Sequence, residues 1–567
     1  MSSIFRRHEH RFILALACAL VIWFAFAKLI VPPLIERAYR GASFSLFNRI
    51  ITAQHTYPLD SYLAVWDWLA LRVPVILVAS GVLALAMTRA DFLRTYVGVA
   101  TPGTLGAIRM WTCLILLITL SWEDLASVAL IPAEMRNRAG FMRFLHVLPI
   151  GYDAFLSSAK ALTAFKAVTE LLLFLGVIGW RTRVVVPLAT VCGFLMVGIL
   201  VEHSFFWHQN LVPLYVLAVL SWTPCGDGWS VDRLWKRYRG RPIPAAEEPR
   251  AVYARARYAC WIVIALSYTA TGLSKWQDGG LYWWHPTNMR SMLFADTLMP
   301  REFDWAWSLH LVTAPDAVFA VLGLTALLAE TGFGVVLVSS RARRIVPVVV
   351  VMMHMGILLF QRILFFDLML LQLVFFDLSR LGRKVGDLIA SRRGRLARST
   401  FPPVDTRDNA ECAPPTVARA RDLRYALVIS ALVVVSLICW YDHVEFYPLT
   451  SWHLYSGLNT SGKITYLKVV GHYDSGHIAP ARLEDGIGAL AFDGRYGPTL
   501  EKCVAQRQPS DLETCRRFLR ASAAAYNARN TRRLTHYEIQ SRTWDFARDA
   551  ANPQYGELTK QWVFDVR

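Results

Sequence analysis

Long apolar runs separated by short polar segments recur along most of the chain. Eleven of these runs approach the roughly 20 residues that an α-helix needs to cross about 30 Å of hydrocarbon. They lie at residues 12–33, 64–87, 107–130, 158–179, 184–202, 207–222, 257–275, 316–338, 345–361, 363–378 and 424–441. The pattern predicts an all-α polytopic membrane helix bundle of about 9–11 spans. The range arises because 345–361 and 363–378 are short and fit either two spans or one re-entrant hairpin.

The pattern changes after the last apolar run. The segments KITYLKVVGHY, HYEIQSRTWDF and KQWVFDV read as strands, and DLETCRRFLRASAAAYNARN reads as a helix. We therefore expect a small C-terminal α+β domain. The expected parts are N-terminal helices at 1–99, a transmembrane core at 100–380, a basic cytoplasmic linker at 381–423, a last helix at 424–442 and an extracytoplasmic domain at 443–567.

Composition and charge support this reading. The chain is 55% hydrophobic and only 18% charged, with a mean hydropathy of +0.35, which argues against a soluble enzyme or a disordered chain. Its net charge of +18 comes from Lys and Arg in alternate short loops, as the positive-inside rule describes, and does not indicate nucleic acid. We expect a multi-pass protein of a bacterial inner membrane that contacts the lipid bilayer, with its N-terminus cytoplasmic and its C-terminal domain extracytoplasmic.

Two of the nine cysteines, Cys503 and Cys515, lie in the predicted C-terminal domain. An oxidising extracytoplasmic compartment permits a disulfide bond between them.

Ionisable residues inside apolar runs are costly and therefore suggest function. Lys275 is either an interfacial lysine that extends to the headgroups beside Trp276 or a desolvated amine that is kept neutral to act as a base. His354 is either a hydrogen-bonded core residue or a functional one. Glu330 needs a partner or a proton at its depth.

A polar turn, VEHSFFWHQN, joins two of the apolar runs. Glu202, His203 and His208 are either a polar turn with aromatic anchors or three metal ligands, and we expect no metal. The topology places this turn, Lys275 and the C-terminal domain on the same outer side. The expected site is walled by aromatic residues such as Trp207 and Trp276, and it suits a flat, apolar, lipid-borne ligand such as a quinone.

Three segments carry a resemblance to a known family. WHQNLVPLY, TPCGDGWSVDRL and SYTATGLSKWQDGGLYWW, in this order, resemble the vitamin K-dependent gamma-glutamyl carboxylase superfamily, including bacterial members with the horizontally transferred transmembrane (HTTM) domain. The likeness covers roughly residues 100–380. It implies that Lys275 is the base that deprotonates reduced vitamin K or menaquinol, that His208 assists carboxylation, and that His354 matches a histidine of a later span.

The resemblance implies an enzyme of carbon–carbon lyase or quinol epoxidase type, with quinol- and oxygen-dependent base chemistry at the outer face. Glu202, His203 and Glu330 would support its catalytic residues. The alternative is a non-enzymatic assembly or export scaffold that binds an extracytoplasmic protein partner. A transporter is less favoured, because the chain has no internal repeat and no matched pair of broken spans.

Overall fold

The structure is a computed structural model of the 567-residue chain. It describes residues 2–40, 58–136, 140–148, 150–203, 208–241, 249–298, 303, 305–377, 420–488, 496–505, 509–549 and 556–567. Two compact units make up the fold, and each is described by itself. The first comprises Met1–Gly98, Arg143–Tyr152 and Ser399–Ser451, and the second comprises Val99–Met142, Asp153–Arg398 and Trp452–Arg567. The expected linker at 381–423 lies almost wholly outside the described residues.

The first unit is built from long apolar helices. Its elements are α1 (Ser2–Ala25), a π-helical turn (Phe26–Ile30), α2 (Val31–Tyr39), α4 (Leu59–Met87), α5 (Ala90–Phe92), a second π-helical turn (Leu93–Val97), α7 (Met142–Val147) and α19 (Ala420–Tyr441). The indoles of Trp23 and Trp66 donate hydrogen bonds between the first helical segment and α4. Arg72 of α4 makes two hydrogen bonds, of 2.6 and 2.8 Å, to the carboxylate of Asp442 directly after α19. These polar contacts tie α4 to both of its partner helices.

The second unit holds the remaining helices. They are α6 (Pro102–Ser121), two 3-10 turns (Leu125–Leu130 and Ala133–Met135), α8 (Tyr152–Leu156), α9 (Ala159–Ile178), α10 (Thr182–Val201), α11 (Leu211–Ser221), α12 (Val231–Tyr238), α13 (Ala251–Gly279), α14 (Pro286–Leu298), α15 (Asp316–Thr331), α16 (Ala342–Gln361) and α17 (Phe366–Leu371). Further 3-10 turns lie at Gly280–Tyr282, Trp307–Leu311, Gly332–Leu337 and Gln372–Phe375. α13 contacts α6, α11 and α15, and most of its side chains are buried.

Among the residues that the structure describes, seven helical segments are long and apolar enough to cross a membrane. They are Ile13–Tyr39, Leu59–Met87, Pro102–Ser121, Ala159–Ile178, Thr182–Val201, Asp316–Leu337 and Ala342–Gln361. This composition is consistent with a multi-pass membrane protein.

The other expected spans differ from the prediction in length or polarity. Leu211–Ser221, Phe366–Phe375 and Tyr425–Tyr441 are shorter apolar helices. α13 has 29 residues and is long enough to cross a membrane. It is not among the seven segments, because its sequence is more polar than theirs. The run at 107–130 stops being α-helical at Ser121, where Lys166 donates hydrogen bonds to the carbonyls of Ser121 and Glu123. Satisfying those end carbonyls lets the helix terminate within an apolar sequence.

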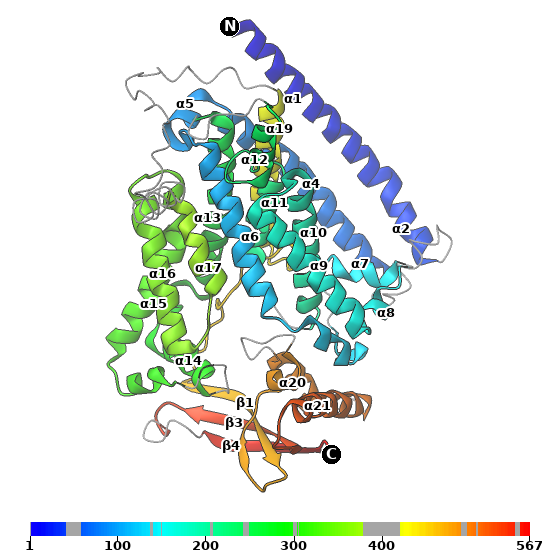
Figure 1. The fold of residues 1–567 in the computed structure, drawn as a ribbon, viewed down its shortest axis with the longest axis vertical. Coiled ribbons are helices and arrows are strands. Elements are labelled where there is room, and N and C mark those ends of the chain that lie inside the picture. The colour runs from blue at the N-terminus through cyan, green and yellow to red at the C-terminus, as the bar shows by residue number, and fades with distance from the viewer. Residues whose placement is uncertain are drawn as a thin grey trace. The chain divides into compact units, whose positions relative to one another are not determined.

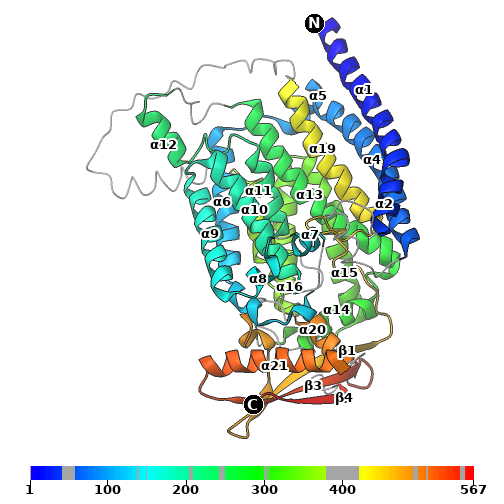
Figure 2. The ribbon, with the colours of Figure 1, turned by 90° about the vertical axis from the view of Figure 1, so that its right-hand side faces the viewer.

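The C-terminal part is a four-stranded antiparallel sheet with helices. The strands are β1 (Lys463–Tyr473), β2 (Ile478–Pro480), β3 (Leu534–Asp545) and β4 (Glu557–Asp565), in the spatial order β2-β1-β3-β4. A 3-10 turn (Leu483–Asp485), α20 (Gly497–Ala505) and α21 (Pro509–Arg529) lie between β2 and β3 in the sequence. α21 lies across one face of the sheet and contacts β3 and β4 (Figures 1 and 2). The predicted α+β composition is confirmed here, including β1, β3, β4 and α21.

One end of the sheet packs against the helical core. Ile464 and Tyr466 of β1 and Trp544 of β3 belong to a buried cluster with Phe294 and Phe319 from α14 and α15. The disulfide bond between Cys503 and Cys515 joins α20 to α21 beside the sheet, as the sequence predicted. Within this unit, the sheet and the core helices therefore share one hydrophobic core.

Candidate active site

A buried ion pair joins α13 to α15. The Nζ of Lys275 lies 2.5 Å from a carboxylate oxygen of Glu330, and the two residues are 3% and 8% exposed. The same Nζ lies 5.2 Å from the centre of the Trp283 ring. Because an isolated charge at this depth would be very costly, the pairing explains how both groups are tolerated in an apolar bundle. Of the two sequence hypotheses for Lys275, burial excludes the lysine that extends to the headgroups.

The pair depends on a close crossing of the two helices. A Cβ atom on Gly272 would lie 2.4 Å from the backbone nitrogen of Thr331, a separation that no side chain tolerates. The indole of Trp276, one turn further along α13, donates a hydrogen bond of 3.2 Å to the hydroxyl of Thr331. Glycine thus lets the backbones approach, and that approach brings Lys275 within reach of Glu330. This is a physical reason for the Gly-x-x-Lys spacing at 272–275.

A second polar group lies two turns before Lys275 on α13. The hydroxyl of Tyr268 lies 2.8 Å from Nε2 of His354 on α16 and accepts a hydrogen bond of 3.1 Å from the Gln372 amide. Tyr268 also stacks on Phe333, with ring centres 4.6 Å apart. Tyr268 and Lys275 lie on the same face of α13, because they are seven residues apart. The structure therefore brings three sequence-predicted residues, Lys275, Glu330 and His354, into one neighbourhood.

Two polar atoms in this neighbourhood lack partners. Nδ1 of His354 and Oε1 of Gln372 are buried and have no hydrogen-bond partner in the described part of the chain. Buried groups of this kind are normally satisfied, so Oε1 of Gln372 can accept a hydrogen bond from a ligand, and Nδ1 of His354 can donate or accept one according to its tautomer. The aromatic rings of Phe365 and Phe333 lie beside them, with the Phe365 ring 5.0 Å from that of His354. Apolar aromatic rings thus adjoin two buried polar atoms.

The polar turn contributes differently. Glu202 and His203 are buried at the end of α10, and Nδ1 of His203 lies 2.7 Å from the carbonyl of Ile199. The ring of His208 instead packs against Trp452, with centres 5.6 Å apart. Trp207 lies outside the described residues. His208 therefore packs against the start of the C-terminal part and is not a member of the Lys275–Glu330 pair.

The turn is also tied to α17. A carboxylate oxygen of Asp367 accepts a hydrogen bond of 2.7 Å from the backbone N–H of Asn210, and both residues are fully buried. Asp367 lies on α17, and Gln372, which bonds Tyr268, follows that helix directly. Asp367 thus connects the polar turn to the neighbourhood of Tyr268, His354 and Gln372.

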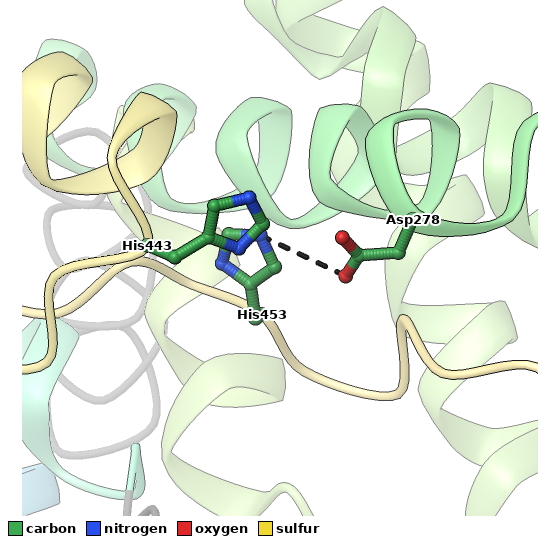
Figure 3. Close-up of side chains that lie close together, drawn as sticks. All are labelled: Asp278, His443 and His453. Atoms are coloured by element: carbon green, nitrogen blue, oxygen red, sulfur yellow. Dashed lines mark ion pairs between the residues drawn. The ribbon is translucent and has the colours of Figure 1, made fainter.

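Residues after 452 cover the end of α13 that carries the pair. His453 lies 3.7 Å from the carboxylate of Asp278, one turn beyond Lys275 (Figure 3). The indole of Trp283 donates a hydrogen bond of 2.8 Å to the carbonyl of Tyr455. The backbone N–H of Asn459 donates a hydrogen bond of 2.7 Å to the Asn288 side chain. Trp283, which flanks the Lys275 amine, is therefore held in place by the C-terminal part.

A cavity of about 170 Å³ lies away from this pair. It is lined mainly by β1, by residues 481–484 and by α20, with Ala295 of α14 at one side. Its lining includes Arg482 and the carboxylates of Glu484 and Glu501.

Several of these residues were not foreseen from the sequence. Tyr268 and Gln372 were not singled out, nor was the pairing of Asp278 with His453. A signal existed for Tyr268, because it lies seven residues before Lys275 and so shares a helix face with it.

Comparison of the chain with protein-family models, with curated proteins and with solved structures finds no match.

Proposed function

We propose that this protein is a membrane enzyme of the vitamin K-dependent carboxylase-like (HTTM) type that carries out quinol- and oxygen-dependent base chemistry at its extracytoplasmic face. The buried pair of Lys275 and Glu330 carries the proposal, since such chemistry requires a desolvated proton acceptor, and the ring of Trp283 lies beside the Lys275 amine. A reduced quinone would supply the acidic hydroxyl and the electrons for epoxide formation.

The pair offers a defined proton acceptor. With the proton on Lys275, the pair is an ammonium and a carboxylate, with no net charge. The Glu330 carboxylate then takes up a proton while Lys275 stays charged, and the pair becomes a net cation. That positive charge stabilises the negative charge that develops on the substrate oxygen, and it does so most strongly where water is excluded. Lys275 and Glu330 would therefore act as one unit.

The surrounding residues would bind and orient the ring. Nδ1 of His354 and Oε1 of Gln372, which have no partner among the described residues, would hydrogen-bond the oxygens of a quinol, and Trp276, Trp283 and Phe333 would hold its faces. Because Lys275 is only 3% exposed, a substrate would reach its amine only when a residue that covers the amine, such as Trp283, moves. The C-terminal part holds Trp283 through the hydrogen bond to Tyr455. That part would therefore control the access of a substrate to the Lys275 amine.

Oxygen uptake by the purified full-length protein, given reduced vitamin K or menaquinol, tests the proposal. Wild type should consume oxygen in proportion to quinol. Lys275→Arg puts a larger, planar guanidinium in place of the compact ammonium of the buried pair, and Glu330→Gln removes the acceptor, so each should lower the rate by at least about a hundredfold. Lys463→Arg, at an exposed β1 position, is the matched control and should keep the full rate. Wild-type uptake equal to that of Lys275→Arg would rule out the proposed site.

A partner-binding scaffold is the second candidate. The observation that favours it is the edge strand β4, in which residues 557–561 are exposed and which pairs only with β3 among the described strands. Such an edge can accept a strand from another protein. A scaffold should tolerate Lys275→Arg but lose its partner when β4 is changed, for example by Gln561→Pro.

A further inference from the structure

A short amphipathic helix, α12, presents an apolar face to its surroundings. Leu234, Trp235 and Tyr238 are 66%, 54% and 84% exposed. At 100° per residue they lie on one side of the helix together with Val231. A soluble surface seldom presents two large aromatic residues and a leucine on a single two-turn face.

The opposite side of α12 is basic. Arg233, Lys236 and Arg237 lie there, and Arg239 and Arg241 follow the helix directly. The guanidinium of Arg239 lies 4.6 Å from the centre of the Trp235 ring, so cationic and aromatic groups adjoin at the boundary between the two sides. The only acidic residue within α12 is Asp232, whose carboxylate is used internally.

Asp232 fixes α12 to the turn between α9 and α10. Its two oxygens accept hydrogen bonds of 2.6 and 2.8 Å from the backbone N–H groups of Arg181 and Thr182. The hydroxyl of Ser230 caps the helix by accepting a bond of 3.0 Å from the N–H of Arg233. α12 is therefore held in one orientation, with its apolar side outward.

The loop that leads into α12 is anchored from inside the bundle. The buried guanidinium of Arg109 donates hydrogen bonds of 3.0 and 2.6 Å to the carbonyls of Cys225 and Trp229. A Cβ atom on Gly228 would lie 2.0 Å from the carbonyl oxygen of Pro102, so this loop packs directly on the start of α6. The GDGWSVD segment thus sets the position of α12.

α12 lies where membrane-length helices end. The α9–α10 turn that holds it joins two of the seven membrane-length segments. At that turn Trp180 is 40% exposed and carries the Arg181 guanidinium 4.9 Å from its ring centre. Figure 2 shows α12 at the end of the helices of its unit that is opposite the sheet. Exposed tryptophans and arginines at span ends are typical of the bilayer interface.

We propose that α12 lies flat in the interfacial layer of the bilayer, with Leu234, Trp235 and Tyr238 among the acyl chains, and that Arg237 and Arg241 bind anionic phospholipid headgroups. The apolar side gives the insertion, and the basic side gives the preference for negative charge. A protein partner would need a surface that matches both an aromatic and a strongly basic strip, whereas an anionic bilayer surface offers both by its nature.

This lipid site is separate from the Lys275–Glu330 pair. α13 starts close after α12 and carries Lys275 near its other end, and at about 1.5 Å per residue its 29 residues span roughly 40 Å. Substitutions in α12 therefore test lipid binding without touching the proposed proton acceptor.

The test is native mass spectrometry of the full-length protein released from detergent after equilibration with phosphatidylglycerol and phosphatidylcholine. Wild type should retain phosphatidylglycerol preferentially. Arg237→Gln with Arg241→Gln should weaken that binding by roughly tenfold or more, because each basic residue near an anionic surface contributes about a factor of five. Arg520→Gln with Lys560→Gln, two exposed positions in the C-terminal part, removes the same charge and should leave binding unchanged.

Two further arms complete the test. Trp235→Ser with Tyr238→Ser should reduce retention of both lipids, because the apolar side is lost. In wild type, phosphatidylglycerol retention should fall as ionic strength rises, which needs no variant. Equal retention of the two lipids by wild type, as expected of a protein-docking helix, would overturn the proposal. So would equal losses in the Arg237/Arg241 and Arg520/Lys560 variants, or unchanged retention in the Trp235/Tyr238 variant.

Discussion

Gly272 packs against the backbone of Thr331 so closely that a Cβ atom would lie 2.4 Å from the Thr331 nitrogen. This contact sets the distance between α13 and α15, and the Lys275–Glu330 pair lies directly beside it. The glycine at position 272 thus allows the helix spacing at which Lys275 and Glu330 meet.

Gly272→Ala should therefore lower stability by about 1–3 kcal/mol, because the added methyl group must push the two helices apart. Thermal unfolding of the purified protein in detergent would measure this. Gly356→Ala is the matched control: Gly356 also lies within a helix, but its Cβ position has no neighbour within 4 Å. That control should be neutral or stabilising by up to about 1 kcal/mol. Equal effects at both positions would contradict the close crossing.

Breaking the buried pair should cost more than removing both of its members. Lys275→Met or Glu330→Gln alone leaves a polar group without its partner, and we expect each to destabilise by about 3–5 kcal/mol. The double substitution should recover much of that loss, as a double-mutant cycle of unfolding free energies would show. The exposed Lys28–Asp67 pair, at 64% and 62% side-chain exposure, serves as the comparison and should show a coupling below about 1 kcal/mol. Strictly additive effects at Lys275 and Glu330 would mean that the pair is not formed.

The C-terminal sheet should lose stability in acid through Glu538. Burial raises the pKa of this carboxyl, but hydrogen bonds from Gln540 and His472 outweigh that effect and lower the pKa below its usual range. A lowered folded-state pKa gives stability that is present above the unfolded pKa of about 4.3 and is lost as the pH falls through the folded value. The gap in melting temperature between wild type and Glu538→Gln should therefore be widest near neutral pH and close in acid. A gap that does not change with pH would count against this pairing.

The Cys503–Cys515 disulfide bond should stabilise the C-terminal part. It closes a loop of 12 residues, for which loop-closure entropy gives about 3 kcal/mol. The double variant Cys503→Ala, Cys515→Ala should unfold at a lower temperature than wild type. Alkylation of the unreduced, unfolded protein should leave both cysteines unlabelled. Labelling of both in protein taken from its native membrane would contradict the bond and the oxidising side that we expect for this domain.

The sequence could predict local features because their causes are local. The alternating pattern at 463–473 predicts β1, and long apolar runs predict helices α4, α9 and α10. Lys275 and Glu330 can be recognised in the sequence as unusual, because a charged side chain inside an apolar run is costly to bury. Their pairing could not be seen, because it joins residues 55 positions apart through a helix crossing that no periodicity encodes.

The same limit applies to span ends and distant contacts. At the end of α6, Lys166 from α9 donates a hydrogen bond to the Ser121 carbonyl, and the bond from Trp283 to Tyr455 joins segments far apart in sequence. Gln372 was missed because its importance lies in a bond to Tyr268, which only the folded bundle brings near.

The most direct measurement is the mass-spectrometric search for quinone epoxide. Purified protein would be given oxygen with reduced vitamin K or menaquinol, beside Lys275→Ala and the Lys463→Arg control. The account predicts epoxide from wild type and from the control, and none above background from Lys275→Ala. Equal epoxide from Lys275→Ala, or none from folded wild type with either quinol, would contradict it.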